Sequence, residues 1–131
     1  RIFDSGEDFE RRTQSLAQAA FNASHDNNTL DSRSPSKGPE PEGVVVGQFG
    51  RKSIAFIGLE RVGGVMAYDV TDPAKPVFLT YFNSRNGLTG DRGPEGLTLI
   101  PAKRSPNGKP LLIVGQEVSG TTAIIQIDLV P

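Results

Sequence analysis

The chain has 131 residues, a formal net charge of −1 at neutral pH and no cysteine. Its 15 glycines and 10 prolines are about a fifth of all residues, which argues against a self-contained helical protein. The balanced charge gives no basic patch for nucleic acid, so we expect no nucleic-acid partner. No apolar run approaches the ~20 residues of a membrane-spanning helix, so no transmembrane segment is expected. Without cysteine, disulfides and thiolate zinc sites are excluded.

The first part of the chain, residues 1–42, contains few branched aliphatic residues and predicts one helix followed by a polar loop. Asp4 or Ser5 can cap the helix, and acidic residues in its first turn suit the helix dipole. Apolar side chains at helical spacing extend the predicted helix to about Ala20. Residues 22–42 carry almost no apolar side chains, which predicts a loop that is ordered only against a scaffold or on binding a ligand.

After residue 42 the sequence holds almost all of the valine and isoleucine, in short runs separated by turn-forming residues. The runs predict strands at residues 44–49, 53–60, 65–70, 76–82, 97–101, 110–117 and 122–129. Because the connections are short, consecutive strands should pair antiparallel. The predicted fold class is therefore all-β, an antiparallel meander preceded by a helix and a polar loop.

Short motifs recur roughly 50 residues apart, a period that is typical of β-propeller blades. The recurring pairs are Pro41-Glu42-Gly43 with Pro94-Glu95-Gly96, Gly58-Leu59-Glu60 with Gly115-Gln116-Glu117, and Tyr68-Asp69-Val70 with Ile127-Asp128-Leu129. The repeat predicts a four-stranded blade at residues 43–84 and a three-stranded final blade at residues 85–131. Residues 1–42 would be an insertion before the first blade.

About two blades cannot close a ring, which typically takes 4–8. We therefore expect the chain to be the C-terminal part of one larger domain, whose missing blades are its partners. Self-association is the other possibility, in which the exposed sheet edges of one copy pair with those of another. An independent small β-sandwich remains the alternative architecture.

Seven segments spread over the chain resemble one family of proteins. They are DSGEDFE (4–10), FNASHDNNTLDSRS (21–34), KGPEPEGVVVG (37–47), AFIGLERVGGVMAYDVTDP (55–73), GDRGPEGL (90–97), SPNGKPLLIV (105–114) and EVSGTT (117–122). The family is choice-of-anchor I, whose members are secreted or surface-anchored bacterial propeller proteins, some labelled alkaline phosphatase. A mesenchyme-specific cell-surface glycoprotein of animals is similar. The resemblance implies an extracellular, periplasmic or cell-surface location and supplies no agreed set of catalytic residues.

Blade geometry predicts that four carboxylates share one face of the molecule. The loop entering the innermost strand contains Glu42 in the first blade and Glu95 in the second, and the loop joining the second and third strands contains Glu60 and Glu117. Hard oxygen ligands of this type suit Ca²⁺ or Mg²⁺, so these residues are candidate metal ligands, and calcium is the candidate cofactor, with no cofactor as the alternative. The alternative is structural: each Glu accepts backbone N–H bonds and holds a glycine-rich turn.

Asp26 and Asp31 in the polar loop are further candidate calcium ligands, although their spacing is not that of an EF-hand and Asp is also an ordinary turn former. Asp91, Arg61 and Arg92 are expected on the same face as ligand-binding residues. The arginines would clamp an anion such as phosphate.

No catalytic residue is identified. His25 is the only histidine, which excludes a zinc site with several histidines in this chain, and no nucleophile-elbow motif accompanies it. The sequence therefore favours an extracellular or cell-surface β-propeller module for attachment or ligand recognition, with calcium binding. The alternative is part of a metal-dependent, alkaline phosphatase-like phosphoesterase that hydrolyses phosphoric monoesters, with cations neutralising the transferred phosphoryl group. A fragment without activity of its own is the third possibility.

Overall fold

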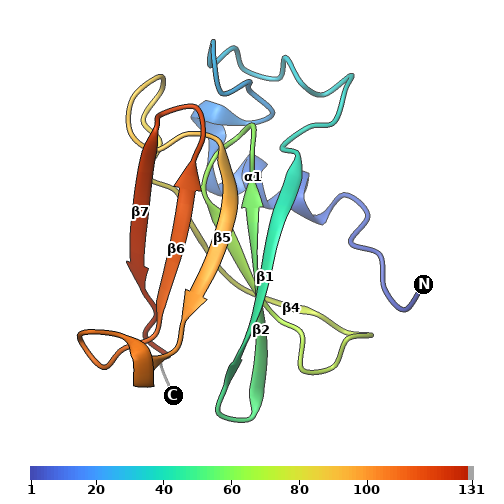
Figure 1. Ribbon diagram of the computed structural model, residues 1–131. Helices are drawn as coiled ribbons and strands as arrows, with labels where there is room; N and C mark the ends of the chain where they lie inside the picture. Colours follow the sequence, from blue (N-terminus) through green and yellow to red (C-terminus); the bar gives the residue numbers. More distant parts are fainter. Residues whose placement is uncertain (130–131) are drawn as a thin grey trace.

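The computed structural model describes residues 1–129, which form two antiparallel sheets and one α-helix (Figure 1). The first sheet has the order β1 (Pro41–Phe49), β2 (Lys52–Leu59), β3 (Val65–Asp69) and β4 (Val77–Phe82). The second has the order β5 (Pro94–Ile100), β6 (Leu111–Gln116) and β7 (Thr121–Gln126). A 3-10 turn, η2 (Ala102–Arg104), follows β5.

This architecture confirms the predicted all-β antiparallel meander, and the two sheets are compatible with neighbouring blades of a propeller. The last two residues of the predicted unit 85–131 lie outside the described residues. In the part of the chain that the structure describes, no helix has the length and apolar character needed to cross a membrane.

The N-terminal helix is shorter than predicted, because α1 spans Asp8–Leu16 and a separate 3-10 turn, η1, spans Gln18–Ala20. Ala17 separates them with a φ of −137°, outside the helical region. Neither Asp4 nor Ser5 caps the helix, since Glu7 precedes α1 and no side chain caps it. The carboxylate of Asp4 instead accepts a hydrogen bond within the turn before the helix.

α1 packs on the outer strands of the first sheet, on the face turned away from the second sheet. The ring of Phe9 lies 5.7 Å from that of Tyr68, and the guanidinium of Arg12 lies 3.9 Å above the ring of Phe78. The hydroxyl of Tyr68 donates to the carboxylate of Asp8 at 2.7 Å, and Arg12 donates to the same carboxylate at 2.8 Å. The helix thus covers β3 and β4 and leaves β1 uncovered.

The two sheets approach each other most closely at β1 and β5, which run side by side in Figure 1. A Cβ added to Gly43 would lie 2.2 Å from the backbone oxygen of Glu95, and one added to Gly47 would lie 2.6 Å from Leu99 Cδ1. The apolar core between the sheets comprises Ile54, Phe56, Val65, Ala67, Leu112 and Val114. Toward the outer strands the sheets diverge around an opening of about 160 Å³.

Replacing Gly43 with alanine should destabilise the fold, because the added methyl group has to push the backbone of β5 away from β1. Overpacking of this kind costs about 1–3 kcal/mol. The matched control is Gly96→Ala, at the equivalent place in the second sheet, where an added Cβ meets nothing within 4 Å. Urea unfolding of both variants checks the prediction, and equal midpoints would contradict it.

Candidate functional site

The polar loop of residues 22–40 is ordered and lies across one end of the two sheets (Figure 1, top). It closes on itself through two backbone hydrogen bonds, from Asp31 N–H to the carbonyl of Phe21 at 2.9 Å and from Arg33 N–H to the carbonyl of Asn22 at 2.8 Å. The loop was predicted to be ordered only against a scaffold or on binding a ligand, and the end of the two sheets is that scaffold.

Arg85, in the connection between β4 and β5, fastens the loop to the first sheet. Each of its N–H groups has an acceptor: the carbonyl oxygens of Gly87, Arg61, Val62 and Ser24, and the side-chain oxygen of Asn28, at 2.7–3.3 Å. Burial and the nearby Arg92 cation lower the pKa of Arg85. A guanidinium saturated by neutral acceptors acts as a structural anchor and has no donor left for a ligand.

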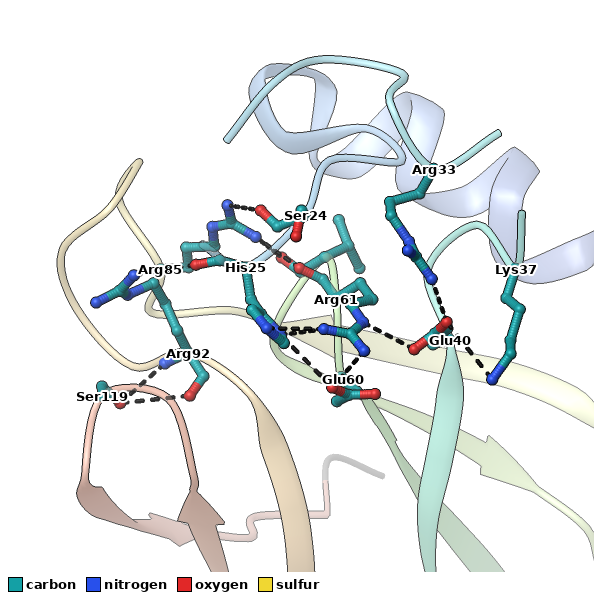
Figure 2. A network of polar contacts seen from close by, with 11 residues as sticks. Ser24, His25, Arg33, Lys37, Glu40, Glu60, Arg61, Arg85, Arg92 and Ser119 are labelled. Atoms are coloured by element: carbon teal, nitrogen blue, oxygen red, sulfur yellow. Dashed lines mark hydrogen bonds and ion pairs between the residues drawn. The ribbon is translucent and has the colours of Figure 1, made fainter. Parts of the chain in front are cut away.

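A charged network lies under the loop, with Arg61 at its centre (Figure 2). Arg61 Nε donates to Glu40 Oε2 at 2.8 Å, and Arg61 Nη2 lies 3.3 Å from Glu60 Oε1. Arg61 Nη1 lies 2.7 Å from Nε2 and 3.1 Å from Nδ1 of His25, and His25 Nδ1 lies 3.5 Å from Glu60 Oε1. The two carboxylates are buried, with side-chain exposures of 2% for Glu40 and 8% for Glu60.

Glu40 is the most strongly paired anion of this network. Besides Arg61, it accepts a hydrogen bond from Arg33, and Lys37 Nζ lies 3.8 Å away. Burial alone would raise the pKa of Glu40, but the hydrogen bond from Arg61 and the surrounding cations lower it to about 2. Glu40 is therefore ionised throughout the physiological range.

Glu60 has the opposite electrostatics. Burial raises its pKa to about 7, and the neighbouring Glu40 carboxylate, which accepts a hydrogen bond from protonated Glu60, adds to the effect. Burial, followed by the Arg61 cation, lowers the pKa of His25. Near neutral pH the site thus holds a neutral imidazole beside a carboxyl that changes its charge readily.

The backbone of the site is repeated in the second sheet, and so is the carboxylate of Glu60, as Glu117, whereas Glu40 and Arg61 have no charged counterparts there. Glu60 N–H donates to the carbonyl of Glu40 at 2.9 Å, and Glu117 N–H donates in the same way to Gly93 at 2.8 Å. Glu40 and Gly93 share a left-handed backbone, with φ of +49° and +72°. Because that conformation costs a non-glycine residue ~1 kcal/mol, Glu40 is held there by its ion pairs. Val118 likewise occupies the place of Arg61.

Of the four predicted glutamates, Glu42 and Glu117 each lie close to Glu60, in two separate groups. Ligand atoms of Glu40, Glu42 and Glu60 lie within 4.8 Å of one another, and so do those of His25, Glu60 and Glu117. Glu42 and Glu117 are exposed. Glu95 is also exposed and belongs to neither of these groups in residues 1–129. That these residues bind calcium stays a prediction.

The remaining candidate residues have identifiable structural contacts. Asp26 is exposed, and a hydrogen bond from the Ser24 hydroxyl lowers its pKa. Asp31 accepts a hydrogen bond from Ser34 within the loop. The structure does not bring these two aspartates into either group around Glu60 in the described part of the chain.

Asp91 and Arg92 lie in the connection between the two sheets, and both form hydrogen bonds to neighbouring segments. Asp91 accepts hydrogen bonds from Thr121 at 2.6 Å and from Ser84 at 2.7 Å, which lower its pKa. Arg92 Nη1 donates to the carbonyl of His25 at 3.0 Å. Arg61 and Arg92 therefore contact the same residue of the loop from the two sheets, as their predicted common face requires.

Sequence reasoning missed Glu40, Arg33, Lys37 and Arg85, and dismissed His25. One signal was available: in the repeat, Glu40 stands before Pro41-Glu42-Gly43, where the second copy has Gly93 before Pro94-Glu95-Gly96. A glutamate that replaces a glycine at such a position points to a carboxylate with strong partners.

The chain is an all-β module of two packed antiparallel sheets with a charged loop across one end, and comparison with known proteins identifies its family. A family model described as the choice-of-anchor I domain matches residues 1–73, more than half of the chain. The chain belongs to the choice-of-anchor I family.

Gigasin-3a of Magallana gigas is 31% identical over 148 aligned residues, which cover 97% of this chain and 51% of that protein. The chain thus spans about half the length of this curated relative. No solved structure matches the present chain significantly.

Proposed function

We propose that this chain is part of an extracellular or surface-anchored β-propeller module that serves attachment or ligand recognition. Membership in the choice-of-anchor I family supports a surface or secreted location, and the likeness to Gigasin-3a is consistent with it. The packing of the two sheets at their inner strands supports the propeller.

The ligand proposed for the charged face is Ca²⁺. The observation that carries this proposal is that Glu60 belongs to two groups of potential ligands at once, one with Glu40 and Glu42 and one with His25 and Glu117. Carboxylate oxygens are the ligands that Ca²⁺ prefers. A divalent cation would also compensate the buried charge of Glu60 and favour its ionised form.

Thermal unfolding with millimolar calcium, and again with chelator, tests the proposal. Calcium at ten times its Kd should add about 1.4 kcal/mol of stability, which raises the Tm by roughly 3–6 °C. Glu60→Gln and Glu117→Gln should each abolish most of this gain. The matched control Glu95→Gln, an exposed glutamate outside both groups, should keep it. An unchanged Tm in the parent chain would leave the glutamates as turn-stabilising residues.

The phosphoesterase alternative has less support from the same geometry. Arg61, expected to hold phosphate, donates to Glu40 and contacts His25, and Arg92 donates to the carbonyl of His25. A phosphate group would have to displace these contacts before either arginine could bind it. The attachment module is therefore the better-supported function.

A further inference from the structure

A pocket of about 280 Å³ lies where three segments that are far apart in the sequence meet. It is lined by residues 16–20 at the end of α1 and in η1, by Asn28 of the polar loop, and by Asn83, Arg85, Asn86 and Gly87 of the connection between β4 and β5. Pockets for small molecules typically measure roughly 300–1,000 Å³, so this one has room for a single small ring. Among the residues of 1–129 that line it, Arg85 is the only charged one.

Arg85 gives this pocket a positive charge that has no anionic partner. All of its N–H groups donate to uncharged carbonyl and amide oxygens, and none of the ion pairs within residues 1–129 includes it. Buried charges in proteins are normally paired with an opposite charge. The pocket therefore favours an anion electrostatically, although Arg85 itself has no donor left to bind one.

Asn28 connects the charge of Arg85 to the ligand space. Arg85 Nη2 donates to Asn28 Oδ1 at 2.8 Å, whereas Asn28 Nδ2 has no hydrogen-bond partner in the described part of the chain. Because neighbouring hydrogen bonds polarise one another, an amide whose oxygen accepts from a cation becomes a stronger donor at its nitrogen. Asn28 is thus the donor best suited to a carboxylate in this pocket.

Two further amides of the pocket are available to a ligand. Gln18 and Asn86 are exposed, and neither side chain forms a hydrogen bond within residues 1–129. Each offers two N–H donors and one acceptor oxygen, the combination that pairs with hydroxyl groups. Asn83 differs, because its amide nitrogen already donates to the Tyr81 hydroxyl at 2.7 Å and to the Val62 carbonyl at 3.3 Å.

We propose that this pocket binds a uronic acid, a single sugar ring that carries a carboxylate. The carboxylate accepts from Asn28 Nδ2 beside the Arg85 cation, and the ring hydroxyls pair with the amides of Gln18 and Asn86. A neutral sugar leaves the charge of Arg85 without a partner, and a simple carboxylate such as acetate leaves the other two amides unused. This inference rests on the proposed function in ligand recognition and names the chemical class of one ligand.

Isothermal titration of the whole chain with D-glucuronate tests the proposal. Chelator is present throughout, so that calcium cannot bridge the sugar to the glutamates of the charged network. Glucuronate should bind saturably, and D-glucose and acetate should each bind at least about tenfold more weakly, because each lacks one set of the hydrogen bonds. No binding of glucuronate, or equal binding of glucose, would overturn the proposal.

Asn28→Asp distinguishes the pocket from any other place where glucuronate could bind. The new carboxylate pairs with Arg85, removes the amide donor and repels the ligand, so the affinity should fall at least about tenfold. The matched control Asn27→Asp makes the same charge change at an exposed residue outside the pocket and should bind like the parent. A folded Asn28→Asp variant that keeps the parent affinity would overturn the proposal.

Asn86→Ala is a second variant, which decides the matter if circular dichroism shows Asn28→Asp to be unfolded. It removes an exposed amide without a hydrogen bond in residues 1–129, so the fold should be unaffected while the affinity falls. An unchanged affinity in Asn86→Ala would contradict the proposed pairing.

The methyl glycoside of glucuronate identifies the source of the ligand. Binding like that of the free acid supports a uronic acid unit of a polysaccharide, and binding of the free acid alone supports the monosaccharide. The rise in Tm with calcium is measured separately, without the sugar. Failure of glucuronate to bind therefore leaves that test of the proposed function intact, and the reverse also holds.

Discussion

Replacing Glu40 with glutamine is expected to lower the free energy of unfolding by about 2–4 kcal/mol at neutral pH. Removing one partner of a buried ion pair costs about 3–5 kcal/mol, reduced here because the cationic partners are partly solvated. Arg61 and Arg33 contact Glu40 with side-chain exposures of 26% and 25%. Glutamine has nearly the same shape, so the loss measures the charge together with one hydrogen bond, because the amide nitrogen cannot accept from Arg33 or Arg61.

The matched control is Glu42→Gln, two residues further along the chain. Glu42 is exposed, so its substitution should change the stability by less than about 0.5 kcal/mol. Urea unfolding followed by circular dichroism measures both variants. If Glu40→Gln unfolds at the same urea concentration as Glu42→Gln, the ion pairs of Glu40 do not stabilise the loop.

The second large effect is a dependence of stability on pH that comes from Glu60, measured without calcium. Below its ordinary pKa of 4.5 this carboxyl is protonated whether the chain is folded or unfolded. As the pH rises from 4.5 to the folded pKa of about 7, the unfolded chain releases the proton while the folded chain keeps it. Unfolding therefore becomes easier by up to roughly 3 kcal/mol across this window.

Comparison with Glu60→Gln isolates this contribution from the other titrating groups. Burial and Arg61 lower the pKa of His25, so His25 adds stability as the pH rises and opposes Glu60. The lowered pKa of Glu40 removes stability only as the pH falls below 4.5 toward 2. Glu60→Gln should match the parent near pH 4.5 and exceed its stability at pH 7. A difference that does not vary with pH would contradict the raised pKa.

The strands were predictable because two independent patterns agreed on them. Runs of β-branched residues between turn residues located each strand, and the recurring Pro-Glu-Gly motif fixed the division into two sheets. The helix was predicted too long at both ends. Helical spacing of apolar residues continues through Ala17, whereas the chain leaves the helical conformation there to begin the turn η1.

The charged site was predictable only where the repeat carries it. Glu42, Glu60 and Glu117 sit at repeated positions, so their common face followed from blade geometry. Glu40 and His25 lie outside the repeated motifs, and their partner Arg61 is 21 and 36 positions away in the chain. Which of the many polar residues of the loop would meet Arg61 depends on the path of the loop, and its sequence has no periodicity from which that path follows.

The same path of the loop has a geometric consequence for any larger assembly. Ser24 is bonded to Arg85, and the adjacent His25 contacts Arg61 of the first sheet with its ring and Arg92, at the entry to the second, with its carbonyl. Two consecutive residues therefore brace the sheets against a change in the angle between them. In a circular arrangement that wedge angle determines how much of a full turn each pair of sheets occupies. The loop residues, more than the strands, would then set how many sheets complete the circle.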